Sequence, residues 1–86
     1  MPEICRFFGI IIYIFYNEHQ PPHLHAIYGE YEVLITIEGL SILSGDLPPR
    51  ALGLVIEWAS LHQEDLKKAW NQALNHQKIN KIEPLR

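Results

Sequence analysis

Three of the five histidines of the chain lie close together, at His19, His23 and His25, beside Glu18 and two consecutive prolines. Histidine titrates near neutral pH and is the commonest metal ligand in proteins, so such a cluster suits metal binding or proton transfer. If His23 and His25 lie on a strand, both imidazoles project from one face with their Cα atoms about 7 Å apart. Both side chains then reach one metal ion or one scissile group, which makes the cluster the candidate site.

The first chemistry that the cluster suits is the binding of a divalent metal ion, the one cofactor that the sequence suggests. The candidate ligands are His19, His23 and His25, with Glu18 or Glu32 as a further oxygen donor. A His-x-His spacing has none of the specificity of paired Cys-x-x-Cys motifs. Histidines with a structural or interface role are therefore the alternative interpretation of the same residues.

The second chemistry is acid–base catalysis by His23 and His25 in opposite protonation states, oriented by a carboxylate such as Glu32. Such a pair could cleave RNA, because one histidine would deprotonate the 2′-hydroxyl while the other protonates the leaving oxygen. A ribonuclease also needs a cation for the phosphate, and Arg6 or Arg50 is the candidate. The net charge of −3 does not support RNA binding, so the sequence leaves open whether the protein is an enzyme.

The composition is typical of an ordered globular protein of one domain, which we expect to span residues 1–86. Hydrophobic residues make up 48% of the chain and charged residues 20%, as in chains that fold around a single core. Cys5 is the only cysteine, which excludes an intrachain disulfide and fits a reducing cytoplasm. The apolar run at 7–16 is too short for a membrane span of about 20 residues, so we expect a cytoplasmic protein without membrane contact.

Hydrophobic patterning predicts an α+β fold: a small antiparallel β-meander of three to four strands with one long C-terminal helix packed on one face. Pro48 and Pro49 favour a helix start, and apolar residues recur at helical spacing over about 49–76. A break near His62 is the alternative to one continuous helix, and a polar tail is expected at 77–86. Strands are predicted at about 7–16, 23–28, 31–38 and 40–44.

The strand register decides which side chains lie beside the histidines. A two-residue turn at Gly29-Glu30 places His25 opposite Leu34, and a six-residue loop after a first strand that ends at residue 16 places Ile14 opposite His25. The sheet face away from the helix would then carry an apolar patch made of Ile10, Ile12, Ile14, Ile27 and Leu34. A bare patch of this kind predicts a homodimer or a protein partner.

Short motifs spread over nearly the whole chain occur together: MPEI at 1–4, RFFGI at 6–10, NEH at 17–19, PPHLHA at 21–26, YGE at 28–30, GDLP at 45–48 and EWA at 57–59. In these motifs the sequence resembles a family of small bacterial proteins known as domain of unknown function 4160. The resemblance implies a short protein that is often encoded beside a second small protein, in a pair that looks like a toxin–antitoxin module. It marks Pro21, Pro22, His23 and His25 as a site without implying an activity for them.

The leading hypothesis from the sequence is therefore a component of a toxin–antitoxin-like two-gene module, which acts by contact with a small protein encoded nearby or with a second copy of itself. The alternatives are a small ribonuclease-like toxin that uses His23 and His25, and a metal-binding protein that uses His19, His23 and His25.

Overall fold

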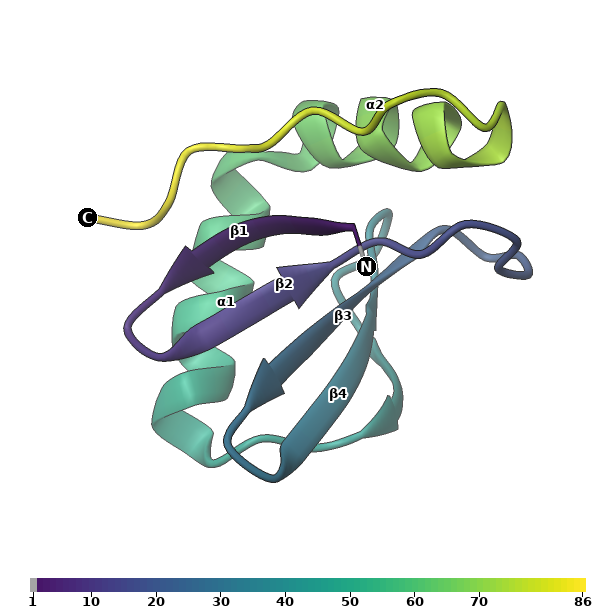
Figure 1. Cartoon of the computed structure of the whole chain (residues 1–86). Coiled ribbons are helices and arrows are strands. Elements are labelled where there is room, and N and C mark those ends of the chain that lie inside the picture. The colour runs from purple at the N-terminus through teal and green to yellow at the C-terminus, as the bar shows by residue number, and fades with distance from the viewer. Residues whose placement is uncertain (1) are drawn as a thin grey trace.

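The structure, a computed structural model, describes residues 2–86. Within these residues the predicted α+β fold is confirmed, with five strands where three to four were expected and two helices where one was expected. In chain order the elements are β1 (Glu3–Phe7), β2 (Ile10–Tyr13), β3 (His23–Tyr28), β4 (Tyr31–Thr36), β5 (Ile42–Gly45), α1 (Pro49–Leu61) and α2 (Gln63–Leu74). The strands form one antiparallel sheet in the order β1-β2-β3-β4-β5. Figure 1 shows α1 behind this sheet and α2 across its upper end.

The apolar run at 7–16 is not one strand, because a tight turn interrupts it at Phe8 and Gly9. Both residues have positive φ, 50° and 79° respectively, as the central residues of a type I′ hairpin turn do. Phe7 consequently opposes Ile10, and the run is divided between the end of β1 and all of β2. The prediction of a continuous strand failed because the residues on both sides of Gly9 have high strand propensity, which hides a turn between them.

This early hairpin shifts the pairing of β2 with β3 by one residue from the predicted register. Tyr13 opposes His25, where Ile14 was expected. Because side chains alternate along a strand, a shift by one residue moves every side chain of the strand to the other face of the sheet.

The apolar patch predicted on the face away from the helix is therefore wrong for three of its five members. Ile10, Ile12 and Ile14 are completely buried in the core on the α1 side of the sheet. Ile27 and Leu34 lie on the opposite face, where they are half-buried. The patch made of these five residues therefore does not exist on the surface, and the partner that it predicted stays a prediction without this support.

The β3–β4 hairpin has the predicted register. Gly29 has a φ of 59° in the turn, His25 opposes Leu34 and Leu24 opposes Ile35. The flanking bounds differ slightly, because β4 ends at residue 36 and β5 covers 42–45. The alternation of β3 puts Leu24 in the core and both histidines on the opposite face.

The expected continuous helix is broken at His62, whose φ of −124° and ψ of 26° are not helical. The side-chain amide of Gln63 donates hydrogen bonds to the carbonyls of Ile37 and Glu38, 3.0 and 3.1 Å away. These bonds attach the start of α2 to the chain just after β4, so α2 turns away from α1. No helix within residues 2–86 is long and apolar enough to cross a membrane.

The segment 77–86, predicted as a polar tail, packs along β1. Ile79 and Ile82 are buried, and the N–H of Ile82 donates to the carbonyl of Ile4 at 2.9 Å. The indole N–H of Trp58 in α1 donates to the carbonyl of Glu83 at 2.7 Å. The tail therefore covers the outer edge of β1, as Figure 1 shows, whereas β5 forms the other edge of the sheet.

Candidate metal centre

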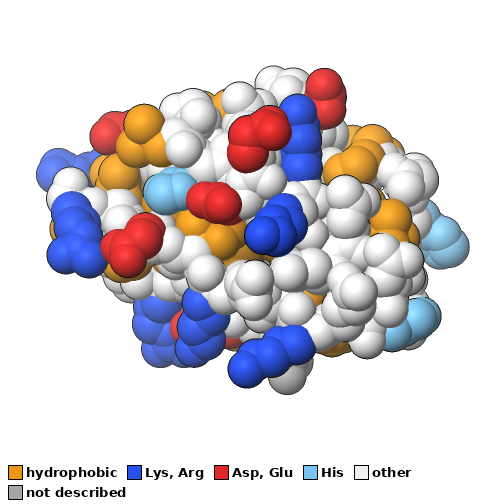
Figure 2. Space-filling view, turned by 90° about the horizontal axis from the view of Figure 1, so that it is seen from above, with side chains coloured by type: hydrophobic (Ala, Val, Ile, Leu, Met, Phe, Trp, Pro, Cys, Tyr) orange, Lys and Arg blue, Asp and Glu red, His pale blue; other side chains and the backbone are white. Residues whose placement is uncertain are grey.

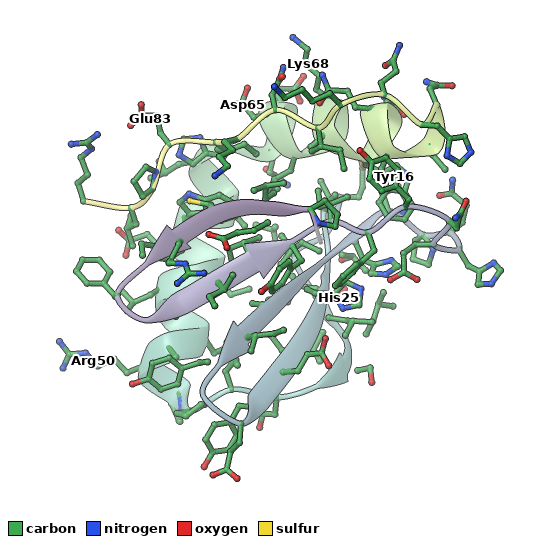
Figure 3. All side chains as sticks on the ribbon, viewed as in Figure 1. Tyr16, His25, Arg50, Asp65, Lys68 and Glu83 are labelled. Atoms are coloured by element: carbon green, nitrogen blue, oxygen red, sulfur yellow. The ribbon has the colours of Figure 1, made fainter. Side chains whose placement is uncertain are left out.

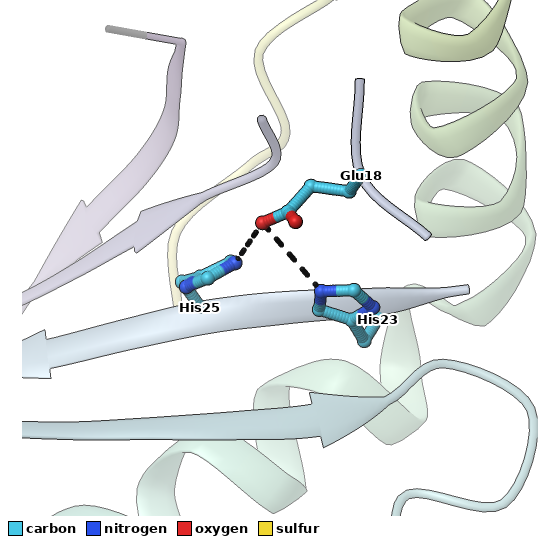
Figure 4. A group of neighbouring side chains, drawn as sticks. All are labelled: Glu18, His23 and His25. Carbon is cyan, nitrogen blue, oxygen red and sulfur yellow. Dashed lines mark hydrogen bonds and ion pairs between the residues drawn. The ribbon is translucent and has the colours of Figure 1, made fainter. Parts of the chain in front are cut away.

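The candidate centre lies where the loop between β2 and β3 returns to the sheet. His23 and His25 are two residues apart on β3, so the strand repeat places their rings on one face, with ring centroids 5.3 Å apart. Glu18 extends from the loop toward both rings (Figure 4). The cis Gln20-Pro21 peptide lies between Glu18 and the histidines.

Two aromatic side chains cover the histidines, although this sheet face was expected to be open. Phe15 contacts His25 edge-on with ring centroids 4.5 Å apart, and Trp70 of α2 lies 5.2 Å from the ring of His23. His23 is consequently only 6% exposed and His25 only 9%. Nothing in the local sequence pattern around Trp70 indicated that it would cover the histidines.

The carboxylate of Glu18 is shared by both rings. Its Oε1 atom lies 2.6 Å from Nε2 of His25 and 3.7 Å from Nε2 of His23 (Figure 4). The ligand atoms of these three residues all lie within 4.8 Å of one another. Ligands bound to one ion at 2.0 to 2.2 Å are typically about 3 Å apart, so the two measured separations bracket the distance that a shared ion requires.

The outward nitrogen of each ring is held by an acceptor. Nδ1 of His23 donates to the carbonyl of Pro21 at 2.8 Å, and Nδ1 of His25 donates to Oε2 of Glu32 at 3.0 Å. Because a carbonyl only accepts, the hydrogen of a neutral His23 is on Nδ1, and the lone pair of Nε2 is directed toward Glu18. This is the arrangement found around metal-binding histidines, whose second nitrogen is usually fixed by a carbonyl or a carboxylate.

Nε2 of His23 is buried and has no hydrogen-bond partner within residues 2–86. The same is true of the indole Nε1 of Trp70, the ring that packs against His23. A buried polar atom without a partner costs free energy, and native proteins rarely contain one without a reason. A metal ion between His23 and Glu18 would use the lone pair of Nε2.

His25 lies between two carboxylates, since Glu18 contacts Nε2 and Glu32 contacts Nδ1. Ionised carboxylates only accept hydrogen bonds. A metal ion bound to Nε2 and to Glu18 would leave Nδ1 of His25 to donate its hydrogen to Glu32. The arrangement therefore suits a metal-bound imidazole that Glu32 holds in place.

Other residues named from the sequence lie outside this group. His19 is exposed and does not belong to the metal-binding group. Glu32 accepts a hydrogen bond from Nδ1 of His25 and is not one of the three grouped ligands. Arg6 lies on β1, where its guanidinium pairs with Glu3 at 2.8 Å. From the sequence, Glu18 was only an alternative ligand. The loop conformation places Glu18, and not His19, beside the two histidines, and no local sequence pattern predicts that conformation.

Cys5 is buried in the core, and burial raises the pKa of its thiol to about 11. At pH 8 only about one thiol in a thousand is therefore ionised, and the thiolate is the reactive form. We expect Ellman's reagent to modify the folded protein at least 100-fold more slowly than the protein unfolded in guanidinium. Immediate modification of the folded protein would show that Cys5 is accessible.

The model of the family described as domain of unknown function (DUF4160) matches residues 9–71. The chain belongs to the DUF4160 family. The matched segment contains Glu18, His23, His25 and Glu32, as well as Trp70. The description of DUF4160 assigns no activity to these residues. No curated protein and no solved structure gives a significant match to the chain.

Proposed function

We propose that this DUF4160 protein binds one divalent transition-metal ion through Glu18, His23 and His25. The observation that carries the proposal is the buried Nε2 of His23. This atom has no hydrogen-bond partner within residues 2–86, and it faces the same carboxylate that contacts Nε2 of His25. Two imidazoles and one carboxylate are a ligand set used for zinc and for non-haem iron.

The surroundings of the three ligands favour a structural metal ion, which holds the loop in place, over a catalytic metal ion that acts on a large substrate. His23 and His25 are only 6% and 9% exposed, and the rings of Phe15 and Trp70 lie against them, so a large substrate has little access to the ligands. An ion would connect Glu18 of the loop to the two histidines of β3, and so hold the loop against the sheet.

The ribonuclease alternative has less support. Both histidines are buried, and Arg6 is already paired with Glu3. On the face formed by α2 and the tail, Lys and Arg side chains are interspersed with Asp and Glu (Figure 2). This mixture offers no continuous basic surface for a phosphate backbone.

Calorimetric titration with zinc chloride and with nickel chloride at pH 7.5 tests the proposal. We expect one ion per chain, and we expect His23→Gln to weaken binding at least 100-fold. His19→Gln is the matched control, because it removes a nearby exposed histidine and should leave the affinity unchanged. Binding should also weaken at pH 5.5, since protons compete with the metal for imidazole nitrogens. The absence of heat with both metals, or equal losses in the two variants, would contradict the proposal.

We also propose that the protein acts in a two-gene module by pairing its free β5 edge with a strand of the small protein encoded beside it. The proposal is supported by the resemblance to a family whose members are often encoded beside a second small protein. It is also supported by the difference between the two edges of the sheet. The tail covers β1, whereas all four residues of β5 are exposed, including Ile42 and Leu43, and none is charged. Uncharged, uncovered edges readily accept another strand.

Co-expression of the two neighbouring genes, followed by size-exclusion chromatography with light scattering, tests this second proposal. We expect a complex of the two proteins that Leu43→Lys disrupts, because a charged residue on an edge strand discourages pairing. A monomer without a bound partner would contradict it. A dimer of this chain alone that Leu43→Lys dissociates would show that the edge binds a second copy.

A further inference from the structure

The β1–β2 turn exposes an aromatic residue in an unfavourable backbone conformation. Phe8 is 62% exposed and has a φ of 50°. In a type I′ turn this position favours asparagine, aspartate or glycine, and positive φ is uncommon for a bulky residue. Phe8 therefore costs conformational free energy and buries little surface in return. Backbone strain of this kind is often found at binding sites.

Phe8 borders a cavity of about 280 Å³ between the turn and the start of α1. Tyr28, at the end of β3, forms a second aromatic wall, and Pro48, Ala51 and Leu54 contribute apolar surface. Gly9 allows this arrangement, because a Cβ atom at position 9 would lie 3.3 Å from Cε1 of Tyr28. The cavity is thus bounded by two aromatic rings with an apolar floor.

Among residues 2–86, Arg50 is the only charged residue that lines the cavity. It is exposed at the beginning of α1, at the end of the molecule opposite α2 (Figure 3). No carboxylate within residues 2–86 forms an ion pair with Arg50, and the first turn of α1 contains no acidic residue. A single guanidinium binds a carboxylate through two parallel hydrogen bonds, whereas a phosphate dianion usually needs further donors.

We propose that this cavity binds a small carboxylic acid with an aromatic or branched apolar body. The apolar part lies between Phe8 and Tyr28, and the carboxylate pairs with Arg50. The cavity volume is near the lower limit of ligand pockets, which favours a ligand of fragment size. The site is separate from the metal centre, because Tyr28 ends β3 whereas His23 begins it. The two proposals can therefore fail independently.

Chemical-shift titration of the ¹⁵N-labelled protein with 3-phenylpropionate tests the proposal, with 3-phenylpropanamide as the uncharged analogue. We expect saturable shifts of the Gly9 and Ala51 amides, and a dissociation constant in about the millimolar range for so small an acid. The acid should bind about threefold to fivefold more tightly than the amide, and Arg50→Gln should remove this difference. Equal affinities for acid and amide, or no saturable shift at either residue, would overturn the proposal.

Phe8→Asn separates binding from folding. Asparagine suits positive φ and the Asn-Gly pair favours a type I′ turn, so the variant should unfold at a higher temperature than the wild type. Its affinity for 3-phenylpropionate should nevertheless fall about tenfold, because one aromatic wall is lost. Leu43→Asn, which changes an exposed apolar residue on β5, is the control and should leave the affinity unchanged. Wild-type affinity in Phe8→Asn would show that the ring has no part in binding.

Discussion

Zinc at about 100 times its dissociation constant is expected to raise the midpoint of thermal unfolding by about 10–20 °C. A ligand that binds only the folded state stabilises it by about 2.7 kcal/mol at this concentration. For a domain of this size, each kcal/mol shifts the midpoint by about 4–8 °C. The proposed ligands meet the folded-state condition, because Glu18 is seven residues from His25 and only the loop conformation brings them to 2.6 Å. Differential scanning calorimetry with and without zinc measures the shift, and a chelator should reverse it.

Variants of the two glutamates that contact His25 distinguish a specific ion from general zinc binding. Glu18→Gln should lose most of the zinc-dependent shift, since the substitution removes a charged ligand. Glu32→Gln should retain a reduced shift, because Glu32 orients His25 through Nδ1 without being one of the proposed ligands. His19→Gln is expected to show the full shift. An undiminished shift in Glu18→Gln would exclude its carboxylate as a ligand.

Gly45→Ala is expected to lower the free energy of unfolding by about 3 kcal/mol. Gly45 has a φ of 75°, which costs a non-glycine residue about 1–2 kcal/mol, and a Cβ atom there would overlap the backbone carbonyl oxygen of Glu32. That carbonyl also accepts a hydrogen bond from the N–H of Asp46 at 3.0 Å, so it has little freedom to move away. Relieving such an overlap typically costs about another 1–3 kcal/mol. Urea-induced unfolding measures the change.

Two other glycines serve as controls that separate steric overlap from backbone strain. Gly29 has a φ of 59° with no atom within 4 Å of the added Cβ, so Gly29→Ala should cost only the strain of about 1 kcal/mol. Gly53 lies inside α1 with the same free space, so Gly53→Ala should stabilise the protein by about 1 kcal/mol. If Gly45→Ala lowers the free energy of unfolding no more than Gly29→Ala does, the carbonyl oxygen of Glu32 does not restrict the residue at position 45.

The close approach of Gly45 to Glu32 also connects the sheet edge to the metal centre. Glu32 contacts β5 through its backbone and His25 through its side chain. A displacement of its backbone by Gly45→Ala should therefore weaken zinc binding as well as lower stability. Gly53→Ala, on the other side of the sheet, should leave the affinity for zinc unchanged.

Local patterns were sufficient for several parts of the fold. Gly29 predicted the β3–β4 turn, and the two-residue repeat of a strand then placed His23 and His25 on one face with Leu34 opposite His25. Pro49 predicted the start of α1. Each of these features depends on backbone geometry over a few residues, which explains why the sequence alone was enough to predict it.

Contacts between distant segments decided the remaining features. The turn at Phe8 shifted β2 by one residue and buried Ile10, because the core on α1 accepts only one face of the strand. In the same way, tertiary contacts group two of the three clustered histidines with Glu18 and cover them with Trp70. Trp70 lies 45 residues after His25 in the sequence. The sequence was enough to show that two histidines share a face. The choice of their carboxylate and their cover depended on loop closure and helix packing, and local spacing carries no information about either.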